Sequence, residues 1–350
     1  MNTPRLRLSV GAGYALAAAA LFGASTPAAK ILVGQTPPFL LAGLLYLASG
    51  VGLALWWLVR HRTEARLQRS DLPVLTGALI AGGVIGPVLL MAGLSRTPAS
   101  AASLLLNMEG VMTALLAWYV FHENYDRRIK AGMMAIMAGG VLLAWSGQFE
   151  WRESIGPLLI AGACLSWAID NNLTRKISAA DPIQIAALKG LAGGVVNCSV
   201  AFWLGSNLPA SGQLAAAAVV GLLGYGLSLV LFILALRQIG AARTGAYFST
   251  APFIGAAISL ILFREAVTGW FIAAGALMGV GVWLHLTERH EHRHLHDVLD
   301  HDHLHSHDEH HQHTHAPGDP PGEPHSHRHH HDRLAHTHEH FPDIHHQHGH

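Results

Sequence analysis

Long apolar runs, separated by short polar or charged segments, fill the first 286 residues of the chain. A transmembrane helix needs about 20 apolar residues to cross a hydrocarbon core of about 30 Å. Runs of that kind occur ten times, over residues 11–33, 39–59, 73–94, 100–121, 129–146, 155–175, 183–204, 213–236, 244–263 and 269–286. The alternation of apolar and polar positions that transmembrane strands require is absent from these runs. The pattern therefore predicts an all-α integral membrane body of ten transmembrane helices.

The composition changes at about residue 287, so averages over the whole chain describe neither part. The last 64 residues hold 24 of the 27 histidines. Residues 287–350 carry a net charge of −8 and residues 1–286 a net charge of +8, and the two cancel in the total. Only 13% of the chain is charged, whereas roughly 25% is usual in soluble proteins. These figures argue against a single water-soluble domain.

The distribution of positive charge predicts which helix ends face the cytoplasm, because short cytoplasmic loops are enriched in Lys and Arg. If the N-terminus is cytoplasmic, thirteen Lys and Arg residues lie in cytoplasmic segments. The opposite loops hold three, Arg96, Arg152 and Arg264. Ten helices then place both termini in the cytoplasm, and we expect a multi-pass protein of the cytoplasmic (inner) membrane.

An internal repeat is visible in the sequence. Leu94–Glu123 aligns without gaps to Leu236–Glu265 at an offset of 142 residues, and an offset near 145 places Phe22–Lys30 over Trp167–Arg175. Each half holds five predicted spans, so the second half enters the membrane from the opposite side. Inverted repeats of this kind recur in secondary transporters, whose substrate site lies near the midplane between the halves.

Three segments carry a resemblance to a known family: LFGASTPAAKILVG near residue 21, NMEGVMTALLAWYVFHE ending at Glu123, and STAPFIGAAISLILFRE ending at Glu265. They resemble the repeated EamA-type module of the drug/metabolite transporter superfamily. The resemblance implies two five-helix modules, over 10–146 and 155–286, and a transporter that exports or exchanges small metabolites. A departure is Gly110, which stands where the second module has Pro252. Residues 287–350 remain as a separate tail.

Two charges of opposite sign are predicted to meet inside the membrane. Asp170 lies toward the cytoplasmic end of the sixth span and Lys189 about two turns into the seventh. The two spans are antiparallel neighbours, and a rise of about 1.5 Å per residue puts both side chains at a similar depth. One interpretation is a structural ion pair that makes both charges tolerable in lipid. The other is a gate or a binding site for a substrate carboxylate.

Glu109 lies midway along the fourth span and has no evident partner at its depth. Burial without a partner disfavours the charged form of a carboxyl group, which suits a residue that binds and releases protons. Glu109 is therefore a candidate for proton coupling. The alternative is a hydrogen-bonded residue that packs between helices.

Polar side chains in the spans are further candidates for substrate contact. Asn107 lies next to Glu109, and Asn171 and Asn172 follow Asp170; Asn also joins helices in lipid without contacting substrate. Tyr247 and Ser249 lie in the ninth span, where Ser249 is the repeat equivalent of Asn107. This correspondence predicts that the fourth and ninth spans form the cavity walls.

The histidine-rich tail is predicted to bind divalent metal, because imidazole is a common ligand of Zn²⁺, Ni²⁺, Co²⁺ and Cu²⁺. The candidate ligands follow an alternating pattern: His290, His292, His294, His296, His301, His303, His305, His307, His311, His313, His315, His325, His327 and His329. The tail is rich in Pro and has no periodic apolar face, so we expect it to be disordered without metal.

The function favoured by these features is secondary transport of a small polar, amino-acid-like metabolite. Transport of a divalent metal is the alternative, ranked lower because the spans contain no histidine apart from His285, one residue from the end of the last span. A metal-responsive membrane sensor without transport is a second alternative. No nucleophile with a base, and no His-Glu metal motif, occurs in the spans, so an enzyme is not expected. The expected partners are membrane lipids, a small-molecule substrate and divalent metal ions, with no nucleic acid and no required cofactor; a homodimer is left open.

Overall fold

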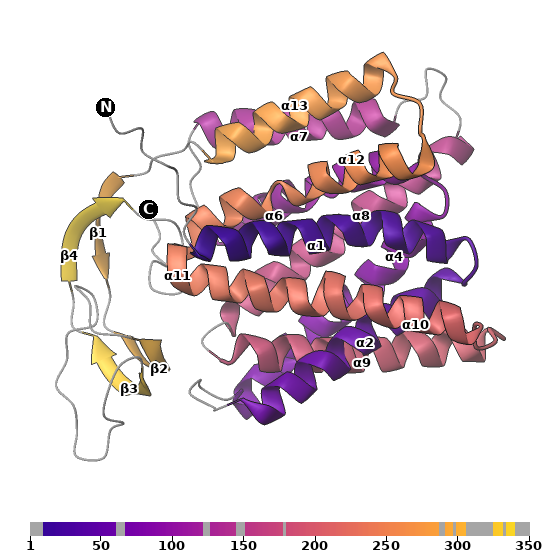
Figure 1. Ribbon diagram of the computed structural model, residues 1–350. Coiled ribbons are helices and arrows are strands. Elements are labelled where there is room, and N and C mark those ends of the chain that lie inside the picture. Colours follow the sequence, from indigo (N-terminus) through magenta and orange to yellow (C-terminus); the bar gives the residue numbers. More distant parts are fainter. Residues whose placement is uncertain are drawn as a thin grey trace, which may run out of the picture.

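The structure is a computed structural model in which the described part of the chain is almost entirely helical in its first 286 residues. It describes residues 10–60, 67–121, 127–144, 151–177, 180–286, 291–296, 299–305, 325–331 and 334–339. The helices run roughly parallel or antiparallel to one another and form a single bundle (Figure 1).

The helical segments follow one another along the chain with short connections. They are α1 (Val10–Val33), α2 (Pro38–Val59), the 3₁₀ turn η1 (Arg69–Asp71), α3 (Leu72–Ala78), the π-helix η2 (Leu79–Ile85), α4 (Gly86–Leu94), α5 (Ala99–Leu105), α6 (Met108–Phe121), α7 (Arg127–Ala144), α8 (Trp151–Lys176), α9 (Pro182–Trp203), α10 (Ser211–Val220), the π-helix η3 (Gly221–Leu227), α11 (Ser228–Phe248), α12 (Ala251–Phe263) and α13 (Gly269–Leu286).

Helices that are long and apolar enough to cross a membrane dominate this body. In the described residues there are six such segments: Val10–Val33, Pro38–Val59, Arg69–Leu94, Ala99–Tyr119, Pro182–Trp203 and Ser211–Ala235. Two shorter apolar helices, Ala251–Phe263 and Gly269–Leu284, accompany them. The count of ten spans stays a prediction.

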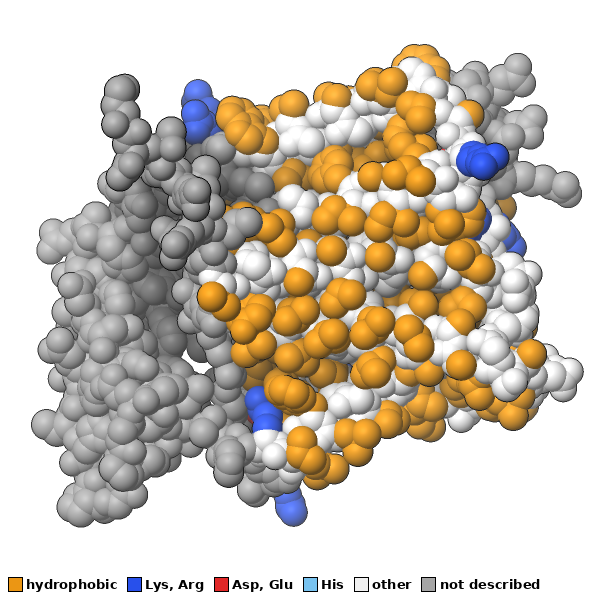
Figure 2. All heavy atoms as spheres, viewed as in Figure 1, with side chains coloured by type: hydrophobic (Ala, Val, Ile, Leu, Met, Phe, Trp, Pro, Cys, Tyr) orange, Lys and Arg blue, Asp and Glu red, His pale blue; other side chains and the backbone are white. Residues whose placement is uncertain are grey.

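The outer surface of the bundle is apolar. Leu55 is 59% exposed, Ile261 80% and Trp203 84%. Figure 2 shows hydrophobic side chains across the visible face of the helices, with Lys and Arg near the two ends of the bundle. An apolar band bounded by cations is the surface that a bilayer requires.

The fourth and ninth predicted spans each contain a break in the helix. The fourth is interrupted at Leu106 and Asn107, between α5 and α6, and the ninth at Ser249 and Thr250, between α11 and α12. The second break precedes Pro252, which fits the first turn of a new helix because it has no N–H. Within α11 the chain reverses between the eighth and ninth spans, because the Phe232 and Phe248 rings lie 4.9 Å apart, whereas a straight helix would separate them by about 24 Å.

The element bounds recur at the offsets seen in the sequence. The π-helix η3 begins and ends 142 residues after η2. The same interval separates α7 from α13, and 144 residues separate α2 from α9. Helices at corresponding positions also pack together, α2 against α9 and α7 against α13 (Figure 1).

Glycine brings these paired helices into backbone contact. A Cβ atom on Gly50 of α2 would lie 2.3 Å from the backbone nitrogen of Leu191 in α9. On the α7–α13 pair, a Cβ on Gly139 would lie 2.9 Å from the Ala274 carbonyl and a Cβ on Gly281 2.7 Å from the Gly132 carbonyl. Close approach through small residues is a common way for helices to associate in lipid.

The tail does not match the predicted disorder where it is described. Four short strands form two antiparallel pairs there, β1 (Glu291–His296) with β4 (Leu334–Glu339) and β2 (Leu299–His305) with β3 (His325–His331). The histidines of these strands alternate with other residues, and a period of two residues is the period of a β-strand. The prediction of disorder did not take this alternation into account. An isolated two-stranded pair is at best marginally stable in water.

The glycine contacts make a testable prediction for Gly50. In Gly50→Ala the new methyl group would clash with backbone atoms of α9, which cannot move aside as a flexible side chain can. We therefore expect a loss of about 1–3 kcal/mol in the free energy of unfolding. Gly13→Ala is the matched control, because a Cβ on Gly13 in α1 has no neighbour within 4 Å. Thermal unfolding of both variants in detergent measures the difference, and equal midpoints would contradict the packing argument.

Candidate functional site

The helices line a partly open cavity of about 320 Å³, a size typical of small-ligand sites. Charged, polar and aromatic side chains share its lining. The lining residues are Phe22, Tyr46, Ser49, Leu53, Glu109, Asp170, Asn171, Ala186, Lys189, Gly190, Gly224, Tyr225, Ser228, Leu229, Phe232 and Phe248. Both halves of the chain therefore contribute to the wall.

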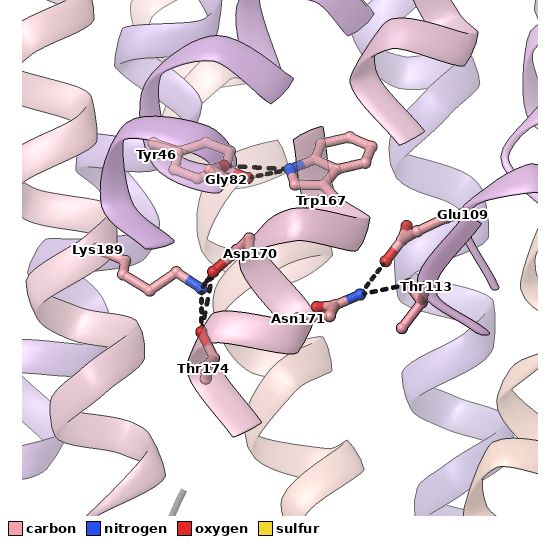
Figure 3. Close-up of polar contacts among 9 residues, drawn as sticks. All are labelled: Tyr46, Gly82, Glu109, Thr113, Trp167, Asp170, Asn171, Thr174 and Lys189. Carbon is pink, nitrogen blue, oxygen red and sulfur yellow. Dashed lines mark hydrogen bonds and ion pairs between the residues drawn. The ribbon is translucent and has the colours of Figure 1, made fainter. Parts of the chain in front are cut away.

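An ion pair between Asp170 and Lys189 lies at this cavity, as the sequence predicted. The Lys189 ammonium donates to both carboxylate oxygens of Asp170, at 2.5 and 2.6 Å. The Thr174 hydroxyl donates to the same carboxylate at 2.9 Å (Figure 3). Only 7% of the Asp170 side chain and 17% of the Lys189 side chain are exposed, so each charge depends on the other for solvation.

Gly82 of η2 makes room for the Asp170 carboxylate. A Cβ atom on Gly82 would lie 1.9 Å from one carboxylate oxygen. The aspartate side chain is thereby held between α8 and the π-helix, in a space that any larger residue at position 82 would fill. No local pattern in the sequence predicts this contact.

Glu109 has a partner that the sequence analysis did not identify. The Asn171 amide donates to its Oε1 atom at 2.9 Å, and the same amide reaches the Thr113 hydroxyl at 3.4 Å. Asn171 follows Asp170 directly on α8 and faces the other way, toward α6 (Figure 3). Consecutive helical residues point about 100° apart, so α8 connects the ion pair on one side with Glu109 on the other.

The remaining polar candidates lie outside the cavity lining. Asn107 donates to the Leu104 carbonyl at 2.9 Å and closes the break between α5 and α6. Asn172 donates to the Thr113 carbonyl at 3.1 Å and joins α8 to α6. Tyr247 and Ser249 also lie outside the lining. The fourth and ninth predicted spans, which were expected to form the walls, contribute one lining residue each, Glu109 and Phe248. Most of the lining comes from the second, sixth, seventh and eighth predicted spans.

Aromatic residues of the cavity were missed. The Tyr46 and Tyr225 rings lie 5.8 Å apart, and Phe22 lies within 6.0 Å of Tyr225 and 5.5 Å of Phe248. The available signal was a tyrosine in the middle of an apolar span. Tyrosine in membrane helices usually gathers at the interface, so a mid-span hydroxyl indicates a polar site.

The π-helix η2 is tied to the second half by two side chains. The Trp167 indole donates to the Gly82 carbonyl at 3.1 Å and to the Tyr46 hydroxyl at 3.3 Å (Figure 3). Asn197 of α9 donates to the Gly83 carbonyl at 3.2 Å. A π-helix interrupts the regular bonding of a helix and is frequent at functional sites. Trp167 thus holds both the irregular backbone and one ring of the cavity wall.

The ion pair on the cavity wall lies nearer one end of the bundle. At this end, which we call the Asp181 end, α8 finishes and α9 begins with Asp181 as its N-cap, and Asp181 pairs with Arg60. Asp170 and Lys189 lie six and seven residues from the respective helix ends, or about 10 Å inward. At the opposite end, the Lys30 end, α1 and α4 finish and α5 and α8 begin.

The metal predictions cannot be followed into the tail. The side chains of the candidate histidines, His290–His329, lie outside the described residues. In the described part of the chain, no group of three or more His, Cys, Asp or Glu side chains is placed to hold a metal ion.

Comparison with known proteins agrees with this geometry. The model of the EamA-like transporter family matches residues 9–145 and 154–287. An uncharacterized transporter of Methanothermobacter thermautotrophicus is 29% identical over 291 residues, covering 77% of this chain and 84% of the relative. A probable amino-acid metabolite efflux pump of Salmonella typhimurium is 26% identical over 290 residues, covering 78% and 93%.

A solved structure, described only as "Crystal structure of protein", has the same fold. It superposes with a TM-score of 0.59 at 20% sequence identity and covers 79% of this chain and 96% of its own.

The ion pair makes a testable prediction for stability. Asp170→Asn or Lys189→Met leaves one buried charge without its partner, so we expect each to lower the free energy of unfolding by about 3 kcal/mol. The double variant removes both charges and should lose less than either single variant. Arg96→Met, which removes an exposed cation, is the control. Unfolding in detergent gives the coupling, and additive losses would mean that the pair does not act as one unit.

Proposed function

Because the chain belongs to the EamA-like transporter family of the drug/metabolite transporter superfamily, we propose that it moves a small, polar, amino-acid-like metabolite across the membrane by alternating access. The observation that carries the proposal is the ion pair at the wall of a cavity between the two halves. A pair at such a site offers both signs of charge to a ligand.

A zwitterion fits this cavity chemically. The Lys189 ammonium is complementary to a substrate carboxylate, and the Asp170 carboxylate to a substrate ammonium group. A zwitterion that inserts between them replaces the internal pair, so no buried charge is left without a partner. The Tyr46 and Tyr225 rings offer an apolar wall with hydroxyl groups for the rest of the molecule. The Salmonella relative is named as an amino-acid metabolite efflux pump, which agrees in class.

Repeat equivalents support two exchanging states. Gly83 and Gly193 pack in close contact, because a Cβ on Gly193 would lie 2.4 Å from the Gly83 carbonyl. Their equivalents, 142 residues later and 144 residues earlier, are Tyr225 and Ser49, and both line the cavity. The Gly83–Gly193 pair is therefore tightly packed, whereas the equivalent pair, Tyr225 and Ser49, borders the cavity.

A second pair behaves in the same way. Gly86 packs against Trp167, because a Cβ on Gly86 would lie 2.8 Å from the indole nitrogen. The equivalents are Ser228 and Phe22, which again line the cavity. In an inverted repeat, the two halves can exchange the open and the packed arrangement, and this exchange is what alternating access requires.

Glu109 is the proposed site of proton coupling. Its carboxylate lies on the cavity wall beside the Asn171 amide. An amide group accepts as well as donates hydrogen bonds, so Asn171 is suited to both protonation states of the glutamate. Movement of α8 against α6 would change this contact together with the ion pair.

Two further parts of the proposal rest on the sequence. The excess of Lys and Arg in alternate loops supports cytoplasmic termini, with the Asp181 end inside. The histidine-rich tail is then a cytoplasmic segment that binds Zn²⁺, Ni²⁺, Co²⁺ or Cu²⁺.

Flux into proteoliposomes tests the cargo. A panel of amino acids, other small metabolites and Zn²⁺, Ni²⁺ and Co²⁺ is offered to the full-length protein and to a version that ends at Leu286. We expect movement of at least one zwitterionic metabolite by both versions, and loss of that movement in Asp170→Asn. Movement of metals alone, dependent on the tail, would show that the metabolite proposal is wrong.

The coupling is tested by replacing Glu109. In Glu109→Gln we expect substrate exchange to persist while an imposed pH gradient no longer drives accumulation, because the amide cannot carry a proton. Glu109→Asp keeps a titratable group and is the matched control, with at least part of the response retained. Accumulation that follows the pH gradient equally in all three proteins would exclude Glu109 as the coupling site.

A further inference from the structure

Glu265, which is not a lining residue of the cavity, binds the start of α5. Its carboxylate accepts the Ala99 N–H at 2.8 Å and the Ser100 N–H at 3.1 Å, and it also accepts the Ser100 hydroxyl. Glu265 lies between α12 and α13 in the second half, whereas α5 belongs to the first. The contact therefore joins the two halves at the Lys30 end.

The chain adopts an unusual conformation to make this contact. Arg264, directly before Glu265, has a φ of 51°, and among the described residues it alone has a positive φ without being glycine. Such a conformation is unfavourable in a non-glycine residue and persists where the surroundings hold it in place. It ends α12 abruptly and turns the chain toward α5.

Lys30 holds the segment that leads into α5. Its ammonium donates to the Leu94 carbonyl at 2.5 Å and to the Thr97 carbonyl at 2.7 Å. The Lys30 ammonium thus binds carbonyl groups of the segment between α4 and α5. The Glu265 carboxylate binds the amide groups at the beginning of α5. Charge-assisted hydrogen bonds of this kind are stronger than neutral ones.

The inner end of α5 leads to the site. After its last residue, Leu105, the helix is interrupted and α6 begins at Met108, one residue before Glu109. Beside Leu105 lies Cys164 of α8, whose sulfur is 3.7 Å from the Leu105 carbonyl. Cys164 is fully buried, so a displacement of α5 would expose it.

We propose that Glu265 and Lys30 form a clamp that keeps the Lys30 end closed, and that release of α5 from this clamp opens the cavity toward that end. This inference rests on the proposed alternating access and adds positioning residues that lie outside the cavity. The proposal follows from position: the clamp lies at the Lys30 end, whereas the ion pair of the cavity wall lies near the opposite end, the Asp181 end. It also gives the strained Arg264 a role, because the strain is maintained only while Glu265 is bound.

Thiol labelling of Cys164 tests the clamp in the full-length protein. A Cys198→Ala background leaves Cys164 as the reporter, and a maleimide is applied to purified protein in detergent, so no orientation in a membrane is assumed. We expect Glu265→Gln to raise the labelling rate of Cys164 about tenfold, because a hydrogen bond to a charged group contributes on that order to an equilibrium constant. Ser100→Ala, which removes one partner and leaves Glu265 intact, should give a smaller increase.

Two controls separate release of α5 from loss of structure. Ser95→Ala removes a hydroxyl at the same end that bonds only to the Ala92 carbonyl of its own helix, and it should leave the rate unchanged. Cys198 packs against Gly43 at the α2–α9 contact and, in a Cys164→Ala background, reports on the rest of the bundle. An increase at Cys164 alone supports the clamp. An unchanged rate at Cys164, or an equal increase at both cysteines, overturns it.

The experiment needs no substrate, so its result is independent of the cargo. A failed flux assay with selective Cys164 exposure would remove the proposed substrate and keep the clamp. Measured transport of a zwitterionic metabolite, with no effect of Glu265→Gln on the labelling of Cys164, would keep the proposed substrate and exclude the clamp.

Discussion

The pairing of Lys189 with Asp170 inside an apolar bundle is the constraint on which the rest of the site depends. Neither charge is tolerable there alone, because water is excluded from most of both side chains. The pair therefore fixes the relation of α8 to α9, and Gly82 is needed to leave space for the carboxylate. Under the proposed function, a ligand that brings its own two charges replaces this pair, and this replacement would link the stability of the bundle to occupation of the cavity.

Most of the helical body could be predicted from the sequence, because the requirement for about 20 apolar residues per span leaves a plain signal. Asp170 and Lys189 could also be paired in advance, since two antiparallel neighbours joined by a short loop place residues at equal distances from that loop side by side. The breaks inside the fourth and ninth spans could not be placed. Hydropathy indicates the length of a span, whereas local backbone hydrogen bonding decides where its helix is interrupted.

The cavity wall was the least predictable part. Asn107 and Ser249, chosen because they are repeat equivalents, lie outside it, and Asn107 serves the helix break instead. A polar side chain in an apolar span needs a hydrogen-bond partner, but the sequence does not show whether that partner is a backbone carbonyl or a substrate. The Tyr46 and Tyr225 rings depend on contacts between distant segments, and no local pattern reports those contacts.

Both members of the ion pair, and the asparagine that binds Glu109, lie within Trp151–Trp203, the stretch that forms α8 and α9. The first half supplies rings, glycines and the π-helix against which this stretch packs. Under the proposed function, the charges that select the ligand all lie in one helical hairpin, α8 and α9. Divergence of this hairpin alone would then change the cargo without altering the helices against which it packs.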